Sequence, residues 1–218
     1  MHRFRLPALA ALACLVGGSP LSAQDAATTA LVQAAERYEA IVGLCADFEQ
    51  HLEVPLLNEE RTSRGRLCQM RPNLFRMDFT EPDGDRVVAD GAHFWIFYPS
   101  LNPGQVIRLP LDPARGGLDF YREFLEEPVA KYEISDEGVE RVGDTRTLRV
   151  KLEPREPRGY RGATVWIDPD TRLIRRVEVV EENGTVRRIT LTGVELDPDL
   201  SAADFAFRVP AGVQVISG

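Results

Sequence analysis

Polar and apolar residues alternate with a period of two along most of this chain, beginning near Leu44. Ahead of that point, residues 25–42 place alanines, Leu31, Val32 and Tyr38 near helical spacing, and Gly43 is a natural stop for a helix. Short apolar or alternating segments bounded by Pro, Gly, Asn and Asp indicate β-strands. The segments that fit are 44–52, 62–70, 73–79, 86–89, 93–98, 105–109, 129–135, 139–142, 147–152, 163–167, 173–181 and 186–196.

Tight turns join most of these predicted strands. Asp90-Gly91 and Asn183-Gly184 are hairpin signals, and Asp168-Pro169-Asp170 has the composition of a turn. Strands joined in this way form an antiparallel meander, which must curl to bury its apolar face. We therefore expect an α+β, mainly β fold, an unclosed antiparallel β-barrel of about eleven strands whose helices cap an apolar cavity.

Residues 112–127 interrupt the strand pattern. Phe120, Phe124 and Leu125 recur at helical spacing among charged residues, which predicts a short amphipathic helix. This helix could close the open side of the barrel as a lid with its apolar residues underneath. The alternative is a surface helix that simply packs on the sheet.

The N-terminus has the pattern of a secretory signal. Arg3 and Arg5 precede an apolar run from Leu6 to Val16, and Leu21-Ser22-Ala23 offers a cleavage site. We expect a signal peptide over residues 1–23, one domain over residues 24–218 and an exported, soluble mature protein. A lipid-modified Cys14 is the competing interpretation, but this cysteine lies inside the apolar run.

Charge and composition exclude several classes of function. Without Arg3 and Arg5 the 26 basic residues become 24 against 34 acidic ones, a net charge of −10. Such a surface repels nucleic acid. His51 and His93 are too few for most zinc sites, and no nucleotide-binding loop or nucleophile elbow occurs. We expect no enzymatic activity, no cofactor and no metal.

Two cysteines, Cys45 and Cys68, follow the predicted signal peptide. If their segments form one hairpin, its centre falls between Leu56 and Leu57, and the cysteines then face each other at bonding distance. An even cysteine count in an exported protein favours a disulfide. Two buried free thiols are the alternative.

Aromatic residues are dense between residues 71 and 99. Phe75, Phe79, Trp95 and Phe97 are candidates for lining an apolar ligand-binding cavity, with ordinary core packing as the alternative. Neighbours along a strand point to opposite faces, so Phe94 and Tyr98 must face away from Trp95. We expect Trp95 and Phe97 to face inward.

Several short motifs in this order resemble a known family. They are Arg71-Pro72-Asn73-Leu74-Phe75, Val88-Ala89-Asp90-Gly91, Trp95-Ile96-Phe97-Tyr98-Pro99, Trp166-Ile167-Asp168-Pro169 and the tail from Asp204 to Val213, with Phe48-Glu49-Gln50 ahead of them. Together they resemble the periplasmic outer-membrane lipoprotein carrier family, LolA, over nearly the whole mature chain.

The resemblance implies a fold and a task. Its members are unclosed β-barrels with a helical lid, which take acylated lipoproteins from an inner-membrane ABC transporter to an outer-membrane receptor across the periplasm. By resemblance, Arg71 matches the arginine that hydrogen-bonds the lid in the empty form, and Phe75 and Trp95 match cavity aromatics. A strand-end arginine in water is the alternative for Arg71. The pair Cys45 and Cys68 departs from the family pattern.

Two other functions remain to be weighed against a monomeric carrier. A lipid- or lipoprotein-sensing regulator could share the same curved sheet, since fold alone does not determine function. An integral outer-membrane barrel is disfavoured by the internal helix and by charged pairs such as Arg175-Arg176 and Arg187-Arg188, which place charge on both faces of a strand.

Overall fold

The computed structural model describes residues 23–111 and 121–218. The expected signal peptide, apart from Ala23, and the expected lid residue Phe120 lie outside the described residues. In the described part of the chain, none of the helices combines the length and the apolar character needed to cross a membrane.

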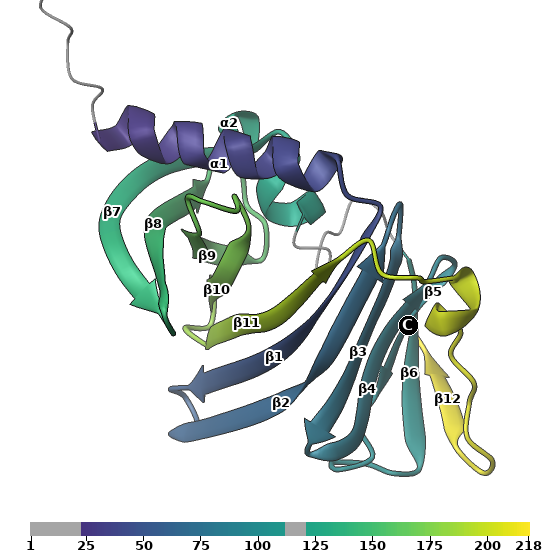
Figure 1. Ribbon diagram of the computed structural model, residues 1–218. Helices are drawn as coiled ribbons and strands as arrows, with labels where there is room; N and C mark the ends of the chain where they lie inside the picture. The colour runs from purple at the N-terminus through teal and green to yellow at the C-terminus, as the bar shows by residue number, and fades with distance from the viewer. Residues whose placement is uncertain (1–22, 112–120) are drawn as a thin grey trace, which may run out of the picture.

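A single sheet of twelve strands dominates the structure (Figure 1). Its strands are β1 (Gly43–Val54), β2 (Glu59–Met70), β3 (Leu74–Glu81), β4 (Asp83–Asp90), β5 (His93–Phe97), β6 (Gln105–Pro110), β7 (Tyr132–Val142), β8 (Thr145–Pro154), β9 (Tyr160–Ile167), β10 (Ile174–Glu181), β11 (Val186–Leu196) and β12 (Gln214–Ser217).

The sheet consists of two runs of neighbouring hairpins, β1 to β6 and β7 to β11. They join where β1 pairs with β11, and the strand order is β12-β6-β5-β4-β3-β2-β1-β11-β10-β9-β8-β7. The sheet curls without closing, since β7 and β12 stay at opposite edges. The expected unclosed, mainly antiparallel sheet is therefore confirmed.

Two details differ from the expected meander of about eleven strands. Residues 132–135 and 139–142 belong to one strand, β7, with an irregularity between Asp136 and Val139, whereas residues 129–131 of the expected strand 129–135 are helical. The tail also adds a strand, because β12 pairs with β6 in parallel. A four-residue strand with no hairpin turn beside it has no periodic signal long enough to detect.

The helix α1 (Ala23–Glu39) crosses the curled sheet on one side (Figure 1). We call the sheet face toward α1 the inner face and the opposite one the outer face. α1 buries Ala27, Leu31, Ala34 and Tyr38, which recur every three or four residues as an amphipathic helix requires. The expected helix at 25–42 is thus confirmed, with its end at Glu39.

The expected helix at 112–127 is only partly described. Its described end is a short π-helical turn, η1 (Tyr121–Leu125), and a separate helical turn, α2 (Pro128–Lys131), follows it. A 3-10 turn, η2 (Ala202–Phe205), precedes β12. Glu127, between η1 and α2, has a positive φ of 48°, so the two turns do not form one helix.

Buried apolar side chains form two clusters, one on each face. The main cluster fills the space between α1 and the inner face, with residues from α1, η1 and strands β1 to β4 and β7 to β11. The second is small and lies on the outer face, where Val88, Trp95 and Val106 are covered by Phe207 and Val213 of the C-terminal segment.

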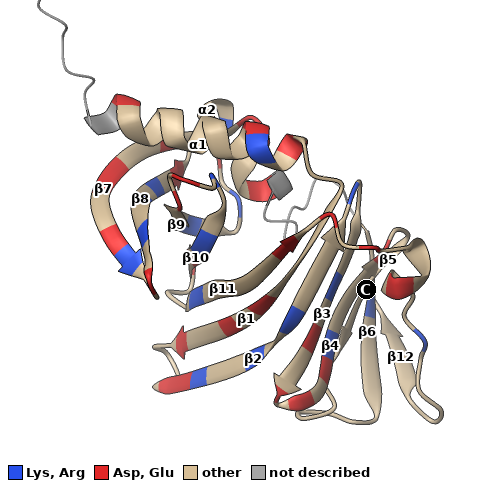
Figure 2. Cartoon of the chain, viewed as in Figure 1, with Lys and Arg blue, Asp and Glu red and all other residues tan. Residues whose placement is uncertain are grey.

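Charged residues of both signs are interspersed along the strands of the sheet (Figure 2). Arg64 pairs with Glu49 and Glu81, and Arg66 pairs with Asp47 and Glu195, so these ion pairs span the adjacent strands β3, β2, β1 and β11. These pairs are about half exposed and contribute little individually. The outer face is therefore mainly a solvated surface.

Candidate functional site

Aromatic residues line the inner face at the centre of the sheet. Phe48 of β1 and Phe79 of β3 meet edge to face with ring centroids 5.2 Å apart, and Phe79 meets Tyr98 in the same way at 5.9 Å. Phe75 is also buried in this main cluster. The structure thus places the two candidates Phe75 and Phe79 on the inner face.

Trp95 and Phe97 lie on the other face, so the expectation that they point inward is wrong. The Trp95 ring stacks on Phe207 with centroids 5.1 Å apart, and its indole N–H donates to Asp90 Oδ2 at 2.7 Å. Their strand neighbours Phe94 and Ile96, with Tyr98, pack against the main cluster instead. Trp95 and Phe97 are stable on the outer face because the C-terminal segment covers them.

The β7–β9 side of the inner face is covered by α1, η1 and α2, which we call the cover. Phe124 and Leu125 of η1 are buried in the main cluster, with 3% and 1% of their surfaces exposed. They contact the same apolar interior as α1, an arrangement that fits both the underside of a lid and a helix packed on the sheet. Phe120, the third expected residue, falls outside the described residues.

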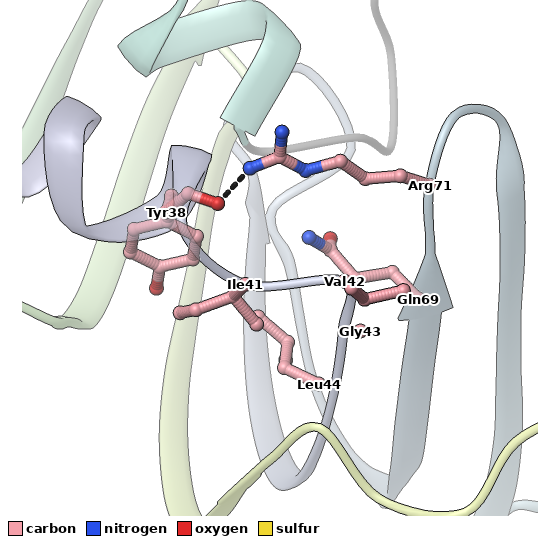
Figure 3. Close-up of a pocket in the computed structure, with 7 residues that line it drawn as sticks. All are labelled: Tyr38, Ile41, Val42, Gly43, Leu44, Gln69 and Arg71. Atoms are coloured by element: carbon pink, nitrogen blue, oxygen red, sulfur yellow. Dashed lines mark hydrogen bonds between the residues drawn. The ribbon is translucent and has the colours of Figure 1, made fainter.

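Arg71 joins the cover to the strands at the end of β2. Its guanidinium Nη2 donates a hydrogen bond to the backbone carbonyl of Tyr38, in the last turn of α1 (Figure 3). Its backbone N–H also donates to Val42 O at 3.0 Å. A helix C-terminus carries unpaired carbonyls and partial negative charge, which a guanidinium neutralises. Arg71 therefore fastens α1 to the β2–β3 corner.

A void of about 10 Å³ lies beside this contact (Figure 3). It has room for about one water molecule. An acyl chain could reach this place only by displacing side chains or α1. The lining residues are Tyr38, Ile41, Val42, Gly43, Leu44, Gln69 and Arg71.

Comparison with known proteins identifies the family. Residues 39–208 match the family described as "Outer membrane lipoprotein carrier protein LolA". The chain belongs to this family. The match covers β1 to β11 and includes Arg71, and it begins one residue after Tyr38, the other side of the contact just described.

Curated relatives agree with this assignment. The outer-membrane lipoprotein carrier protein of Haemophilus ducreyi is 29% identical over 82% of this chain and 80% of its own. The carrier protein of Bordetella avium is 27% identical over 99% of both chains. An uncharacterized conserved protein from Thermus thermophilus, 15% identical, shares the fold with a TM-score of 0.56 over 88% of this chain and 99% of its own.

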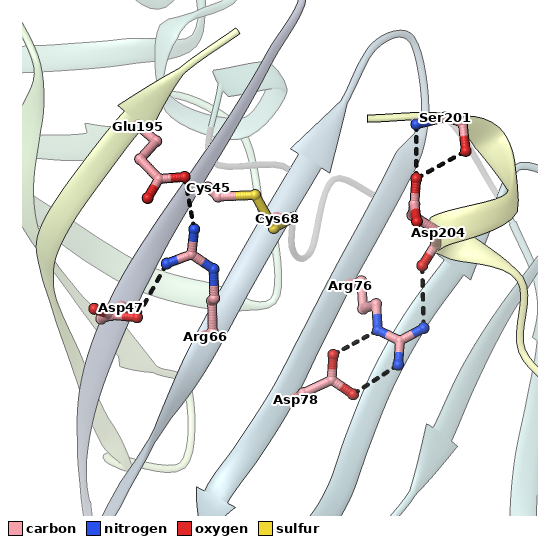
Figure 4. Close-up of a disulfide and its surroundings, with 9 residues drawn as sticks. All are labelled: Cys45, Asp47, Arg66, Cys68, Arg76, Asp78, Glu195, Ser201 and Asp204. Atoms are coloured by element: carbon pink, nitrogen blue, oxygen red, sulfur yellow. Dashed lines mark hydrogen bonds and ion pairs between the residues drawn. A yellow bond between two sulfur atoms is a disulfide. The ribbon is translucent and has the colours of Figure 1, made fainter. Parts of the chain in front are cut away.

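Cys45 and Cys68 form a disulfide between β1 and β2 (Figure 4). They lie directly opposite each other in the ladder, and residues 55–58 form the turn of the hairpin, as the sequence predicted. Cys68 lies three residues before Arg71, and Cys45 two residues after Gly43. The disulfide therefore joins the two strand ends that meet the cover.

Two residues that sequence reasoning did not single out, Asp197 and Ile174, contact the end of α1 and the segment after it in this LolA-family chain. Asp197 Oδ1 accepts hydrogen bonds from the backbone N–H of Val42 at 2.7 Å and of Gly43 at 3.2 Å. Burial raises the pKa of Tyr38 to about 12, against the opposing effect of a backbone hydrogen bond at Ile174. Both partners are more than 100 residues away in the chain, so no local pattern reveals these contacts.

No group of three or more His, Cys, Asp or Glu side chains able to hold a metal occurs within residues 23–111 and 121–218. Asp168-Pro169-Asp170 forms the β9–β10 turn, where Asp168 accepts hydrogen bonds from Asp170 N at 3.0 Å and from Thr171 Oγ1 at 2.7 Å. The described geometry is that of an apolar inner face with a hydrogen-bonded cover.

Proposed function

We propose that this chain is a monomeric periplasmic chaperone that shields the acyl chains of lipoproteins and carries them from the inner to the outer membrane. The observation that carries the proposal is the apolar inner face, closed by α1 and fastened through Arg71. The names of the curated relatives support lipoproteins as cargo. The partners would be an inner-membrane ABC transporter that releases lipoproteins and an outer-membrane receptor.

The energetics of the cargo explain why a carrier is needed. A triacylated anchor has about 45 methylenes, and at about 0.8 kcal/mol each their exposure to water costs about 36 kcal/mol. Non-covalent affinities reach only about 20 kcal/mol. Free diffusion across an aqueous gap is therefore negligible, and the anchor must stay within an apolar site throughout transfer.

The same carrier must also release its cargo. A closed form that buries its own inner face competes with the ligand and lowers its net affinity. A charge-assisted hydrogen bond such as that from Arg71 to Tyr38 O contributes about 1.5–3 kcal/mol to the closed form. We expect Arg71 to act in this way, as the contact that cargo must break on entry and that re-forms on release.

Replacing Arg71 by Leu tests this role. Arg71→Leu removes the guanidinium, so the closed form loses stability and the variant should retain lipoprotein about tenfold more strongly than the wild type. The measurement is the release of newly made lipoprotein from spheroplasts in soluble form, followed by its transfer to outer membranes. Release should persist while transfer fails.

Arg64→Leu is the matched control, because Arg64 lies in β2, seven residues before Arg71, but on the outer face in exposed ion pairs. It should release and transfer lipoprotein like the wild type. Normal transfer by Arg71→Leu would show that Arg71 does not regulate release. A chain that releases no lipoprotein from spheroplasts would instead favour the sensing role, which no observation on this structure supports.

A further inference from the structure

A buried polar cluster fastens the other end of the cover. The hydroxyl of Tyr160 donates to the Glu123 carboxylate, and Tyr132 Oη lies 2.8 Å from Glu123 O and 3.0 Å from its Oε1. The two tyrosine hydroxyl oxygens are 2.7 Å apart. Arg158 Nη1 lies 3.6 Å from Glu123 Oε1, and its guanidinium carbon is 5.8 Å from the Tyr132 ring centroid.

The cluster is well suited to a permanent contact. The Glu123 side chain is only 12% exposed, and charge-assisted hydrogen bonds in such surroundings are among the strongest in proteins. Burial, reinforced by the hydrogen bond to Glu123, raises the pKa of Tyr160. Burial likewise raises the pKa of Tyr132. Both tyrosines therefore stay neutral, and their hydroxyls remain donors over the whole physiological pH range.

Within the described residues, these side-chain partners of Glu123 belong to one side of the sheet. Tyr132 begins β7, Tyr160 begins β9, and Arg158 lies in the turn between β8 and β9. The helix α1 packs on the same strands β7, β8 and β9, and also on η1 and α2. The cover thus rests on the β7–β9 side, whereas Arg71 connects it to the β2–β3 corner.

Glu123 acts through the two residues that follow it. Phe124 and Leu125 are buried in the main cluster, and the Phe124 ring lies 6.3 Å from that of Tyr160. Because the backbone carbonyl and the carboxylate of Glu123 are both held, this segment has little freedom to rotate. Phe124 and Leu125 are therefore kept over the inner face whether or not the Arg71 contact is intact.

We propose that Glu123 is a positioning residue that anchors the cover to the β7–β9 side, so that acyl chains enter between α1 and the β2–β3 corner. The inference rests on the proposed function and adds the place of entry to it. Cargo breaks the Arg71 contact, while the Glu123 cluster stays closed and holds Phe124 and Leu125 against the incoming chains.

Amide hydrogen exchange on the full chain tests the anchor without any cargo. In the empty protein, Tyr160→Phe and Glu123→Gln should raise exchange in residues 123–132 at least about tenfold and leave residues 38–44 unchanged. Arg71→Leu should raise exchange in residues 38–44 and leave residues 123–132 unchanged. Tyr160→Phe keeps the ring that packs on Phe124, so it removes a hydrogen bond with little loss of packing. If Tyr160→Phe or Arg71→Leu raised exchange equally in residues 38–44 and 123–132, the proposal would be overturned.

Glu126→Gln is the matched control, because Glu126 is exposed in the same segment and pairs at 3.5 Å with Lys131. It should leave exchange in residues 123–132 unchanged. A global loss of stability by Tyr160→Phe would raise exchange in every strand. Exchange confined to residues 123–132 therefore distinguishes local release of the anchor from general unfolding.

A synthetic tripalmitoylated peptide tests the place of entry. Its binding to the wild type should raise exchange in residues 38–44 and leave residues 123–132 protected. Increased exchange in residues 123–132 would show that the cover opens from the other side and would overturn the proposal. Failure of the peptide to bind would contradict the carrier function and the place of entry together, while the exchange pattern of the empty variants would still decide whether Glu123 is the anchor.

Discussion

Gly65 shows how a single missing side chain shapes the centre of the inner face. It lies in β2 opposite Phe48 of β1 and beside a register shift between β2 and β3. A Cβ at this position would come within 2.0 Å of Asp78 O and 2.8 Å of Phe48 Cε1. Glycine inside a strand marks such a close backbone approach. Here it gives the Phe48 ring the space in which it meets Phe79.

We expect Gly65→Ala to lower the free energy of unfolding by at least about 2 kcal/mol, since a backbone oxygen cannot move aside as a side chain can. Urea denaturation measures this change. Gly162→Ala in β9 is the control, because its Cβ would meet Leu152 O at an acceptable 3.4 Å. If both variants were equally stable, the close approach at Gly65 would not be a constraint on the fold.

At the scale of elements, the β9–β10 turn depends on one buried carboxylate. Asp168 is 4% exposed and accepts hydrogen bonds from two backbone N–H groups, from Thr171 Oγ1 and from Arg175. Burial alone would raise the pKa of Asp168, but the hydrogen bonds from Arg175 and Thr171 outweigh it and the pKa is lowered. The charged form is therefore the one that holds the turn.

The lowered pKa predicts how stability depends on pH. The contribution of Asp168 is fully present above its unfolded-state pKa of about 3.9 and is lost as pH falls through the lower folded-state value. Asp168→Asn should cost about 2–3 kcal/mol at pH 7. The difference from the wild type should shrink below about pH 4 in unfolding curves. Asp170→Asn, at an exposed position, should change the free energy of unfolding little. If the difference between Asp168→Asn and the wild type did not depend on pH, this mechanism would be ruled out.

Most elements could be predicted because their signals are local. The Asp90-Gly91 and Asn183-Gly184 turns, the spacing of Cys45 and Cys68, and the helical pattern before Gly43 all depend on neighbours in the sequence. The helical signal around Phe124 gave a continuous helix instead of two short turns, because the positive φ of Glu127 leaves no trace in hydrophobic spacing. Contacts between distant segments, such as Asp197 with Val42, were not predictable.

At the scale of the whole molecule, the two faces of the sheet could not be told apart from the sequence. Alternation correctly separates Trp95 and Phe97 from Phe94 and Ile96, but it does not say which set meets the cover. The deciding contact comes from Phe207, more than 100 residues away, which covers Trp95 on the outer face. Arg71 could be singled out because it begins a motif, Arg71 to Phe75, that resembles one in the family.

The positions of the two tryptophans yield a test of the whole arrangement. Trp95 and Trp166 are the chain's two tryptophans, and both lie on the outer face, Trp166 between the guanidinium groups of Arg149 and Arg176 at 5.5 and 5.4 Å. Its strand neighbours Val165 and Ile167 belong to the main cluster. Acyl chains on the inner face would be separated from both indoles by the sheet itself.

We therefore expect a brominated fatty acyl peptide to bind without quenching the intrinsic tryptophan fluorescence, because quenching by bromine requires close contact. Phe79→Trp places an indole on the inner face beside Phe48 and Tyr98, and this variant should be quenched strongly by the same peptide. Phe97→Trp, on the outer face, is the matched control and should not be. Strong quenching of the wild type would place the acyl chains against the outer face, and the inner face beneath α1 would then not be the binding site.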